Sequence, residues 1–168
     1  MAIINPNEFV NEQGIKMVRL PNGQEIPTRA FSKWLEMKIC RLKGWIYNGS
    51  VNDGGVDALT PAGRKVIQIK AYVNYTASSF KLEQKFKNGD EAVAYEEAHK
   101  KEFCEEYAKQ FNTLILYKGK YKGDKITLDN IIEVNGFDNI VEWLMAHAHA
   151  SYQGKKSGEV YGQFKLRW

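Results

Sequence analysis

Residues 53–70 read DGGVDALTPAGRKVIQIK, and this stretch decides the fold. From Lys65 to Tyr72, polar and apolar residues alternate, which predicts a β-strand with one face toward a core. Residues 56–60 form a second predicted extended segment, and Pro61-Ala62-Gly63 is typical of a tight turn between the two. The stretch therefore predicts a hairpin.

Three groups of complementary chemistry meet on this hairpin. Asp57 is predicted to lie nearly opposite Gln68, and Lys70 shares the face of Gln68 because it follows two residues later. A carboxylate, an amide oxygen and a strand carbonyl, such as that of Ile69, are oxygen ligands that Mg²⁺ accepts. A nearby lysine orients or deprotonates a water nucleophile and offsets developing charge. The set predicts metal-dependent hydrolysis of a phosphodiester bond.

The elements around the hairpin predict an α/β domain with a central mixed sheet. Residues 15–27 predict an N-terminal β-hairpin around Pro21-Asn22-Gly23. Apolar residues at helical spacing follow, with Thr28 as the predicted N-cap and Gly44 as the stop. The other predicted elements are a strand at 45–51, a helix at 90–111, a buried strand at 113–117, a strand within 125–134, a helix at 137–150, and an edge strand or arm at 159–168. Residues 73–89 give no clear prediction.

The charge distribution favours a polyanionic partner. The net charge is +4, yet seven acidic residues crowd residues 90–106, so the rest of the chain is clearly basic. Nucleic acid is the commonest polyanion that such a surface binds, although solvated lysine-rich loops have the same composition. The candidate DNA-binding residues are Tyr72, Lys81, Lys85, Lys120 and Lys122.

Three motifs in order resemble a known family. They are Leu42-Lys43-Gly44-Trp45 at the end of a predicted helix, Asp53-Gly54-Gly55-Val56-Asp57, and Gln68-Ile69-Lys70 on the following strand. Together they resemble the PD-(D/E)xK nuclease superfamily, and more closely its Mrr-like restriction endonuclease branch. The resemblance covers residues 30–72, about a quarter of the chain.

The resemblance implies a restriction-endonuclease-like fold, with a central mixed sheet flanked by helices, and assigns roles to residues. Asp57 is the implied principal metal ligand, Gln68 fills the usual glutamate position, and Lys70 is the implied catalytic lysine. Glu36, in the preceding helix, is the implied further acidic member, and it is equally compatible with a plain helix surface. The implied cofactor is Mg²⁺, with Mn²⁺ able to substitute. Gln68 in place of glutamate lowers the negative charge and is expected to weaken metal affinity.

One domain is expected, with a hairpin extension at 1–27, a catalytic core at 28–150 and a basic tail at 151–168. Cys40 and Cys104 lie outside any metal-ligand spacing and are expected to be reduced thiols. Neither a secretory signal nor an apolar run of membrane-spanning length is found, so a cytoplasmic protein is expected.

Three functions remain open. The first is a homodimeric Mg²⁺-dependent endodeoxyribonuclease of restriction, homing or Holliday junction type. The second is a catalytically inactive nuclease-fold module that binds DNA. The third is a protein-interaction domain that docks through the acidic segment 90–111. The Asp-Gly-Gly run by itself is also typical of an ordinary turn, so the choice depends on where the fold places Asp57 and Lys70.

Overall fold

A five-stranded mixed sheet lies at the centre of the structure, as predicted. The computed structural model describes residues 5–48, 57–62, 65–73, 78–154 and 158–168. The strand order is β4-β5-β6-β8-β9, in which β6 and β8 are parallel and the other neighbours are antiparallel. The strands are β4 (Ile46–Tyr47), β5 (Ala58–Leu59), β6 (Val66–Val73), β8 (Thr113–Gly119) and β9 (Ile131–Asn135). The motif residues 53–56 and the strand residues predicted at 49–51 lie outside the described residues.

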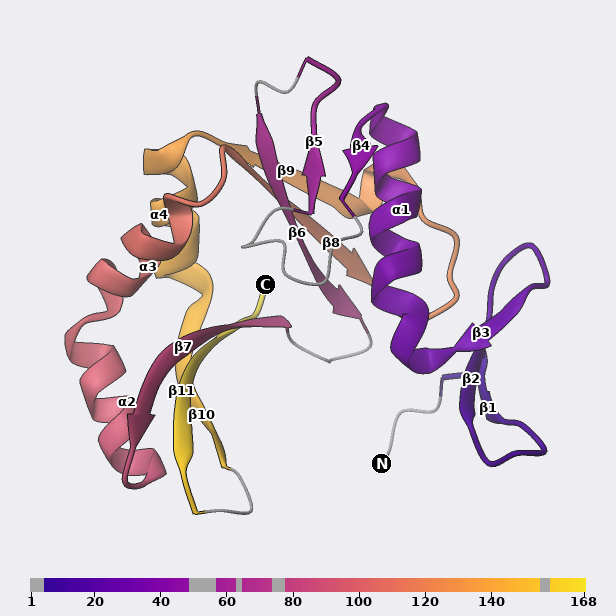
Figure 1. Cartoon of the computed structure of the whole chain (residues 1–168). Coiled ribbons are helices and arrows are strands. Elements are labelled where there is room, and N and C mark those ends of the chain that lie inside the picture. The colour runs from indigo at the N-terminus through magenta and orange to yellow at the C-terminus, as the bar shows by residue number, and fades with distance from the viewer. Residues whose placement is uncertain (1–4, 49–56, 63–64, 74–77, 155–157) are drawn as a thin grey trace.

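The two faces of this sheet are buried in separate cores. On β8, Ile115 and Tyr117 pack in one core, whereas Leu114 and Leu116 pack in the other. An apolar run without alternation is expected for a strand that is covered on both faces. Figure 1 shows helix α1 on one face and helices α3 and α4 on the other.

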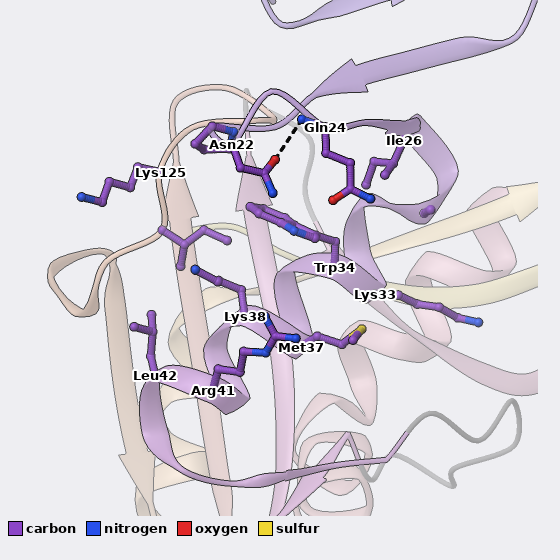
Figure 2. Close-up of a pocket in the computed structure, with 13 residues that line it drawn as sticks. Asn22, Gln24, Ile26, Lys33, Trp34, Met37, Lys38, Arg41, Leu42 and Lys125 are labelled. Atoms are coloured by element: carbon purple, nitrogen blue, oxygen red, sulfur yellow. Dashed lines mark hydrogen bonds between the residues drawn. The ribbon is translucent and has the colours of Figure 1, made fainter.

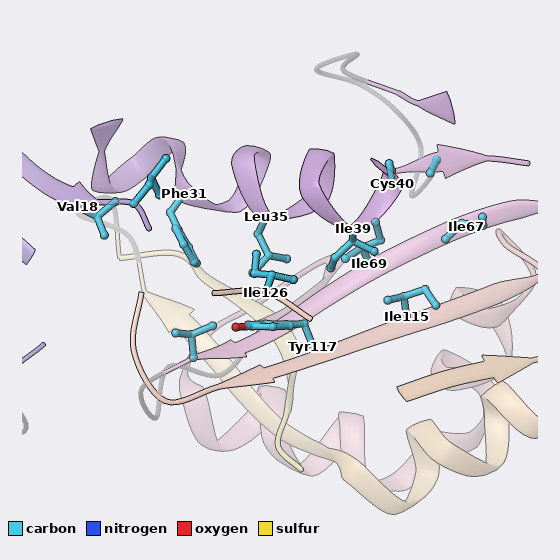
Figure 3. Packing of buried hydrophobic residues seen from close by; sticks show 13 residues of the cluster. Val18, Phe31, Leu35, Ile39, Cys40, Ile67, Ile69, Ile115, Tyr117 and Ile126 are labelled. Carbon is cyan, nitrogen blue, oxygen red and sulfur yellow. The ribbon is translucent and has the colours of Figure 1, made fainter. Parts of the chain in front are cut away.

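Helix α1 (Phe31–Lys43) covers the first face. Phe31, Leu35 and Ile39 recur every four residues and are buried against β6 and β8 (Figure 3). Each such side chain contributes about 1.5–3 kcal/mol when removed from water. The helix ends as predicted at Gly44, whose φ of 73° is left-handed, and the Trp45 N–H then donates to the Cys40 carbonyl at 2.9 Å.

The predicted N-cap was wrong. Thr28 lies within a 3₁₀ turn, η1 (Thr28–Ala30), and the α-helix begins three residues later with Ala30 as its N-cap. No side-chain hydrogen bond caps either element. After Pro27 the chain forms a 3₁₀ turn, which is tighter than an α-helical turn and leads directly into α1. This turn stands where the sequence predicted a first α-helical turn capped by Thr28.

The predicted helix at 90–111 is two helices, α2 (Gly89–Ala98) and α3 (Lys100–Ala108). They meet at His99, which has φ −121° and ψ 19°. The His99 ring stacks on Tyr95 with centroids 4.2 Å apart, and its Nδ1 lies 2.9 Å from the Tyr95 carbonyl. The break allows α2 to pack on β10 and β11 while α3 packs on α4 (Phe137–His147).

Two further sheets flank the central one. The N-terminal sheet has the order β1-β2-β3, so the predicted hairpin gains a third strand. Its strands are β1 (Glu8–Val10), β2 (Lys16–Arg19) and β3 (Glu25–Pro27). The other sheet has the order β10-β11-β7 and is fully antiparallel. Its strands are β7 (Ser78–Phe86), β10 (Ala148–Gly154) and β11 (Val160–Leu166).

This last sheet changes three sequence predictions. Residues 78–86, within the unassigned polar stretch, form a nine-residue strand. Residues 148–150, predicted as the end of a helix, begin β10. β11 lies between β10 and β7 and is therefore neither an edge strand nor an arm. The short 3₁₀ turn η2 (Leu128–Asn130) precedes β9. None of the helices in the described ranges has the length and hydropathy needed to cross a membrane.

Candidate functional site

Asp57 lies where β5 begins, at the side of β6. Its backbone N–H donates to the Ile67 carbonyl at 2.8 Å, and its carbonyl accepts from the Asn48 N–H at 2.9 Å. The register pairs Ala58 with Ile67, so Asp57 falls beside Gln68. The hairpin predicted from the sequence therefore has the expected register, and the backbone around Asp57 is fixed on both sides.

The Asp57 carboxylate binds two groups of β6. Its Oδ2 accepts a hydrogen bond from Gln68 Nε2 at 2.7 Å and another from the Ile69 N–H at 2.7 Å. Asp57 is 7% exposed and Gln68 is 6% exposed. Hydrogen bonds to an ionised carboxylate are roughly twice as strong as those between neutral groups, so this arrangement holds the acid in one orientation.

Gln68 presents an oxygen without a hydrogen-bond partner. Its Nε2 is used by Asp57 and also lies 3.3 Å from the Ile69 carbonyl, whereas its Oε1 is buried and accepts no hydrogen bond within the described part of the chain. A buried polar atom left without a partner costs about 1–3 kcal/mol. The Asp57 carboxylate, Gln68 Oε1 and the Ile69 carbonyl are all hard oxygen donors of the kind that Mg²⁺ accepts, but in this structure Gln68 turns Nε2 rather than Oε1 toward Asp57 and the Ile69 carbonyl, so all three bind one ion only if the amide turns over.

Glu36 faces the same region from α1. The negative charges of Glu36 and Asp57 both act on Tyr47 and on Cys40. Burial raises the pKa of the Tyr47 hydroxyl to about 12, with further contributions from Glu36 and Asp57, and Tyr47 also hydrogen-bonds to Glu36. Burial likewise raises the pKa of the Cys40 thiol to about 11, with smaller contributions from the same two acids. Two carboxylates thus influence a common pair of side chains.

Tyr47 and Cys40 are neighbours of the site that the sequence reasoning missed. Cys40 follows Glu36 by one helical turn, and this i, i+4 spacing was a usable signal. Tyr47 lies on β4, paired with Ala58. Its position beside the acids depends on the pairing of β4 with β5, which the sequence pattern did not give.

Lys70 extends from β6 toward β7. Its ammonium donates to the Ser79 carbonyl at 2.9 Å and lies 5.8 Å from the centroid of the Tyr107 ring. Lys70 is half-buried. Neither Ser79 nor Tyr107 was a predicted neighbour of the lysine, because both come from segments distant from the hairpin in sequence.

Histidine, cysteine, aspartate and glutamate do not build a metal cluster in the described ranges. No group of three or more such side chains is arranged to hold an ion there. A metal at Asp57 would therefore depend on the amide oxygen of Gln68 and on the backbone carbonyl of Ile69, with Glu36 as the second acid. Fewer charged ligands imply weak affinity for a divalent cation.

The five candidate DNA-binding residues are found in three parts of the fold, on β7, on β6 and after β8. Lys81 and Lys85 are exposed on β7, and Lys85 is paired with Glu159 at 3.5 Å. The Tyr161 hydroxyl and Glu159 raise the pKa of Lys85. Tyr72, on β6, packs against Trp168 with ring centroids 5.4 Å apart.

Lys120 and Lys122 lie after β8, and Lys122 contacts the N-terminal sheet. Lys120 is exposed, and its ammonium is 5.6 Å from the Tyr121 ring centroid. Lys122 is paired with Glu8 at 3.6 Å. Of the five candidates, Lys81 and Lys120 are the exposed ones that form no ion pair with another residue of the described ranges.

Comparisons with known proteins leave the geometry as the basis for a function. No protein-family model, no curated protein and no solved structure matches the chain. The nuclease resemblance of residues 30–72 therefore stays a prediction. The feature to be explained is a buried carboxylate, an unpartnered amide oxygen and a lysine on one hairpin.

Proposed function

We propose that the protein is a Mg²⁺-dependent endodeoxyribonuclease with its reaction centre at Asp57, Gln68, Ile69 and Lys70. The observation that supports this most is Gln68 Oε1, which has no hydrogen-bond partner among the described residues and belongs to the residue whose Nε2 helps to orient the Asp57 carboxylate. A buried oxygen that has no hydrogen-bond partner among the described residues suits a hard cation better than it suits a core.

Asp57, Gln68 Oε1 and the Ile69 carbonyl would hold the ion, and Glu36 would add a second carboxylate. A bound Mg²⁺ would polarise the phosphate and lower the pKa of a water ligand. Asp57 keeps its orientation because the Gln68 and Ile69 donors are part of the sheet. These donors fix the site before substrate arrives, which lowers the reorganisation that catalysis requires.

Lys70 would position the attacking water and offset the charge that develops on the phosphate. Its ammonium is aligned by the Ser79 carbonyl and the Tyr107 ring, so the side chain is not free to sample many rotamers. A lysine held in this way keeps its positive charge at one position, unlike a solvated surface lysine that samples many rotamers.

The DNA itself would be held by the exposed lysines of β7 and by the basic C-terminal segment, including Lys165 and Arg167. Cutting both strands of a duplex requires two reaction centres, which favours a homodimer. Restriction-type cleavage, homing and Holliday junction resolution are all compatible with this chemistry.

A second candidate, a DNA-binding module without catalysis, is favoured by two observations. The described residues contain no cluster of three ionisable ligands, and two donors already occupy Asp57 Oδ2. In this alternative the Asp57–Gln68 pair is a structural link between β5 and β6, and no metal is required.

Cleavage of supercoiled plasmid and of a synthetic four-way junction separates the two candidates. Wild type, Lys70→Ala and a matched Lys65→Ala variant are compared with Mg²⁺, with Mn²⁺ and with EDTA. Lys65 is exposed immediately before the same strand, so it controls for the loss of one positive charge. A nuclease cuts with either metal, keeps its activity in Lys65→Ala and loses it in Lys70→Ala. Salt-sensitive DNA binding without cutting by any variant supports the binding module.

A further inference from the structure

A groove of about 870 Å³ lies on the outer side of α1, between this helix, the β2–β3 turn and Ile126. Figure 2 shows Lys33, Met37, Lys38 and Arg41 along the helix, with Lys125 across from them and the Trp34 ring between α1 and Gln24. This cavity shares no lining residue with the candidate reaction centre.

The groove is strongly cationic. Its lining includes Lys33, Lys38, Arg41 and Lys125, and no aspartate or glutamate of the described residues lines it. None of these four cations forms an ion pair with any residue of the described ranges, whereas the nearby Glu25 is paired with Arg19. Four unneutralised cations that line one cavity and its edges favour an anionic ligand.

The floor of the groove is apolar. Met37 is 46% exposed and Leu42 is 41% exposed, both within the lining. Trp34 packs on Phe31 with ring centroids 5.6 Å apart and is only partly buried. Exposed apolar side chains gathered in a cavity mark a ligand that presents apolar surface as well as charge.

The geometry points to a single-stranded nucleic-acid segment as the ligand of this groove. Unpaired bases offer flat apolar faces that pack on Trp34, Met37 and Leu42, while the phosphates meet the cations. A duplex supplies the phosphates but keeps its base faces stacked inside. The side-chain amides of Asn22 and Gln24, at the rim, complete the set as donors and acceptors for base edges.

The groove and the reaction centre lie on different sides of α1. Each helical residue turns about 100° around the axis, so Trp34, Lys38 and Arg41 lie roughly 140–160° from Glu36, whereas Lys33, at one edge of the groove, lies roughly 60° from it. A straight duplex bound at Asp57 does not reach around the helix to this face. A strand in the groove is therefore a separate tail or arm of the substrate, and this role rests on the proposed nuclease function, whereas the binding itself does not.

Binding of a fluorescein-labelled oligothymidylate in EDTA tests the proposal without any cleavage. Lys38→Gln/Arg41→Gln is compared with Lys101→Gln/Lys109→Gln, which removes the same charge from exposed sites on and after α3. Four phosphate contacts predict a slope of about −3 when the logarithm of the association constant is plotted against the logarithm of the salt concentration. The groove variant lacks two of the four cations, so its slope is expected to be shallower by about 1.4. Its affinity at low salt is expected to fall at least about tenfold, while the control keeps both values.

Intrinsic fluorescence gives a second readout. The chain has four tryptophans, and Trp34 is the one in the groove. Oligothymidylate is expected to quench wild type and to change the fluorescence of Trp34→Phe far less. Equal binding by the groove variant and the control overturns the proposal. So does capture of an acidic amphipathic peptide by the groove when oligothymidylate fails to bind.

Plasmid cleavage separates this proposal from the proposed function. If the groove variant loses oligothymidylate binding but still cuts plasmid with Mg²⁺, both proposals stand. If wild type binds oligothymidylate through the groove and no variant cuts DNA, the groove stands and the nuclease does not.

Discussion

Gln68 Nε2 donates a 2.7 Å hydrogen bond to Asp57 Oδ2, and both side chains are buried beside β6. An aspartate accepts and never donates when ionised, so the amide must turn its nitrogen toward Asp57 and its oxygen away. This single constraint creates the unpartnered oxygen on which the proposed function depends.

Gln68→Glu tests whether this oxygen position holds a cation. The substitution replaces the donor with a second carboxylate beside Asp57, and we expect a loss of about 1–3 kcal/mol of unfolding free energy in EDTA. Mg²⁺ is expected to restore more stability to this variant than to wild type, because it neutralises the pair. Thermal unfolding with and without Mg²⁺ measures both effects, and Gln84→Glu, exposed on β7, is the control. Equal responses to Mg²⁺ in the two variants would show that no ion binds.

Asp57→Asn is expected to slow Mg²⁺-dependent cleavage by a factor of about 100 or more, because the carboxylate that Gln68 Nε2 and the Ile69 N–H hold in place is lost. DNA binding in EDTA is expected to persist. Nicking of plasmid over time and fluorescence anisotropy with a duplex measure the two properties. Cleavage by Asp57→Asn at the wild-type rate would exclude Asp57 as the metal ligand.

The buried Glu96 is expected to make the unfolding free energy depend on pH, and this effect does not involve the candidate reaction centre. Its side chain is 0% exposed, and burial raises its pKa to about 7, although the Gln163 and Ser151 backbones partly oppose the shift. The folded protein binds a proton on the Glu96 carboxyl group more tightly than the unfolded chain does. The stabilisation that this proton gives is therefore fully present below pH 4.5. It is lost as the pH rises from there to about 7.

Glu96→Gln is therefore expected to gain stability relative to wild type as the pH rises, by up to about 3 kcal/mol. Urea unfolding at pH 5 and at pH 8 gives the difference, and Glu97→Gln, its exposed neighbour, is the control. A constant difference between wild type and Glu96→Gln at the two pH values would contradict the shift.

Gly44→Ala is expected to lower the unfolding free energy by about 1–2 kcal/mol, because φ at this helix end is 73° and an L side chain is disfavoured there. Gly154→Ala is the matched control, since it lies at the end of β10 with an ordinary φ and open space around its Cα. Chemical denaturation of both variants measures the effect. A loss of equal size in Gly154→Ala would mean that backbone conformation is not the cause.

The parts of the fold that the sequence predicted depend on local pattern. The alternation of Lys65 to Tyr72 gave β6, and the short turn before it fixed the register that places Asp57 beside Gln68. Gly44 gave the end of α1 for the same reason, since a left-handed residue there requires no distant partner.

The parts that the sequence did not predict depend on distant pairing. The polar residues of β7 show little periodicity, and the strand exists because β11 pairs with it. The helix breaks at His99 because α2 packs on β10 and β11, whereas α3 packs on α4. In the candidate site, the same distinction separates Gln68, which was predicted beside Asp57, from Ser79 and Tyr107, which were not predicted beside Lys70.

The position of the Asp57–Gln68 pair also bears on the order in which the molecule assembles. This hydrogen bond joins residues 11 apart in sequence, whereas the link from the Val66 N–H to Asn112 Oδ1, where β6 meets β8, joins residues 46 apart. Closing the longer loop costs more chain entropy. The hairpin that carries the acid and the amide is thus able to form early, and the parallel pairing that buries it closes the sheet afterwards.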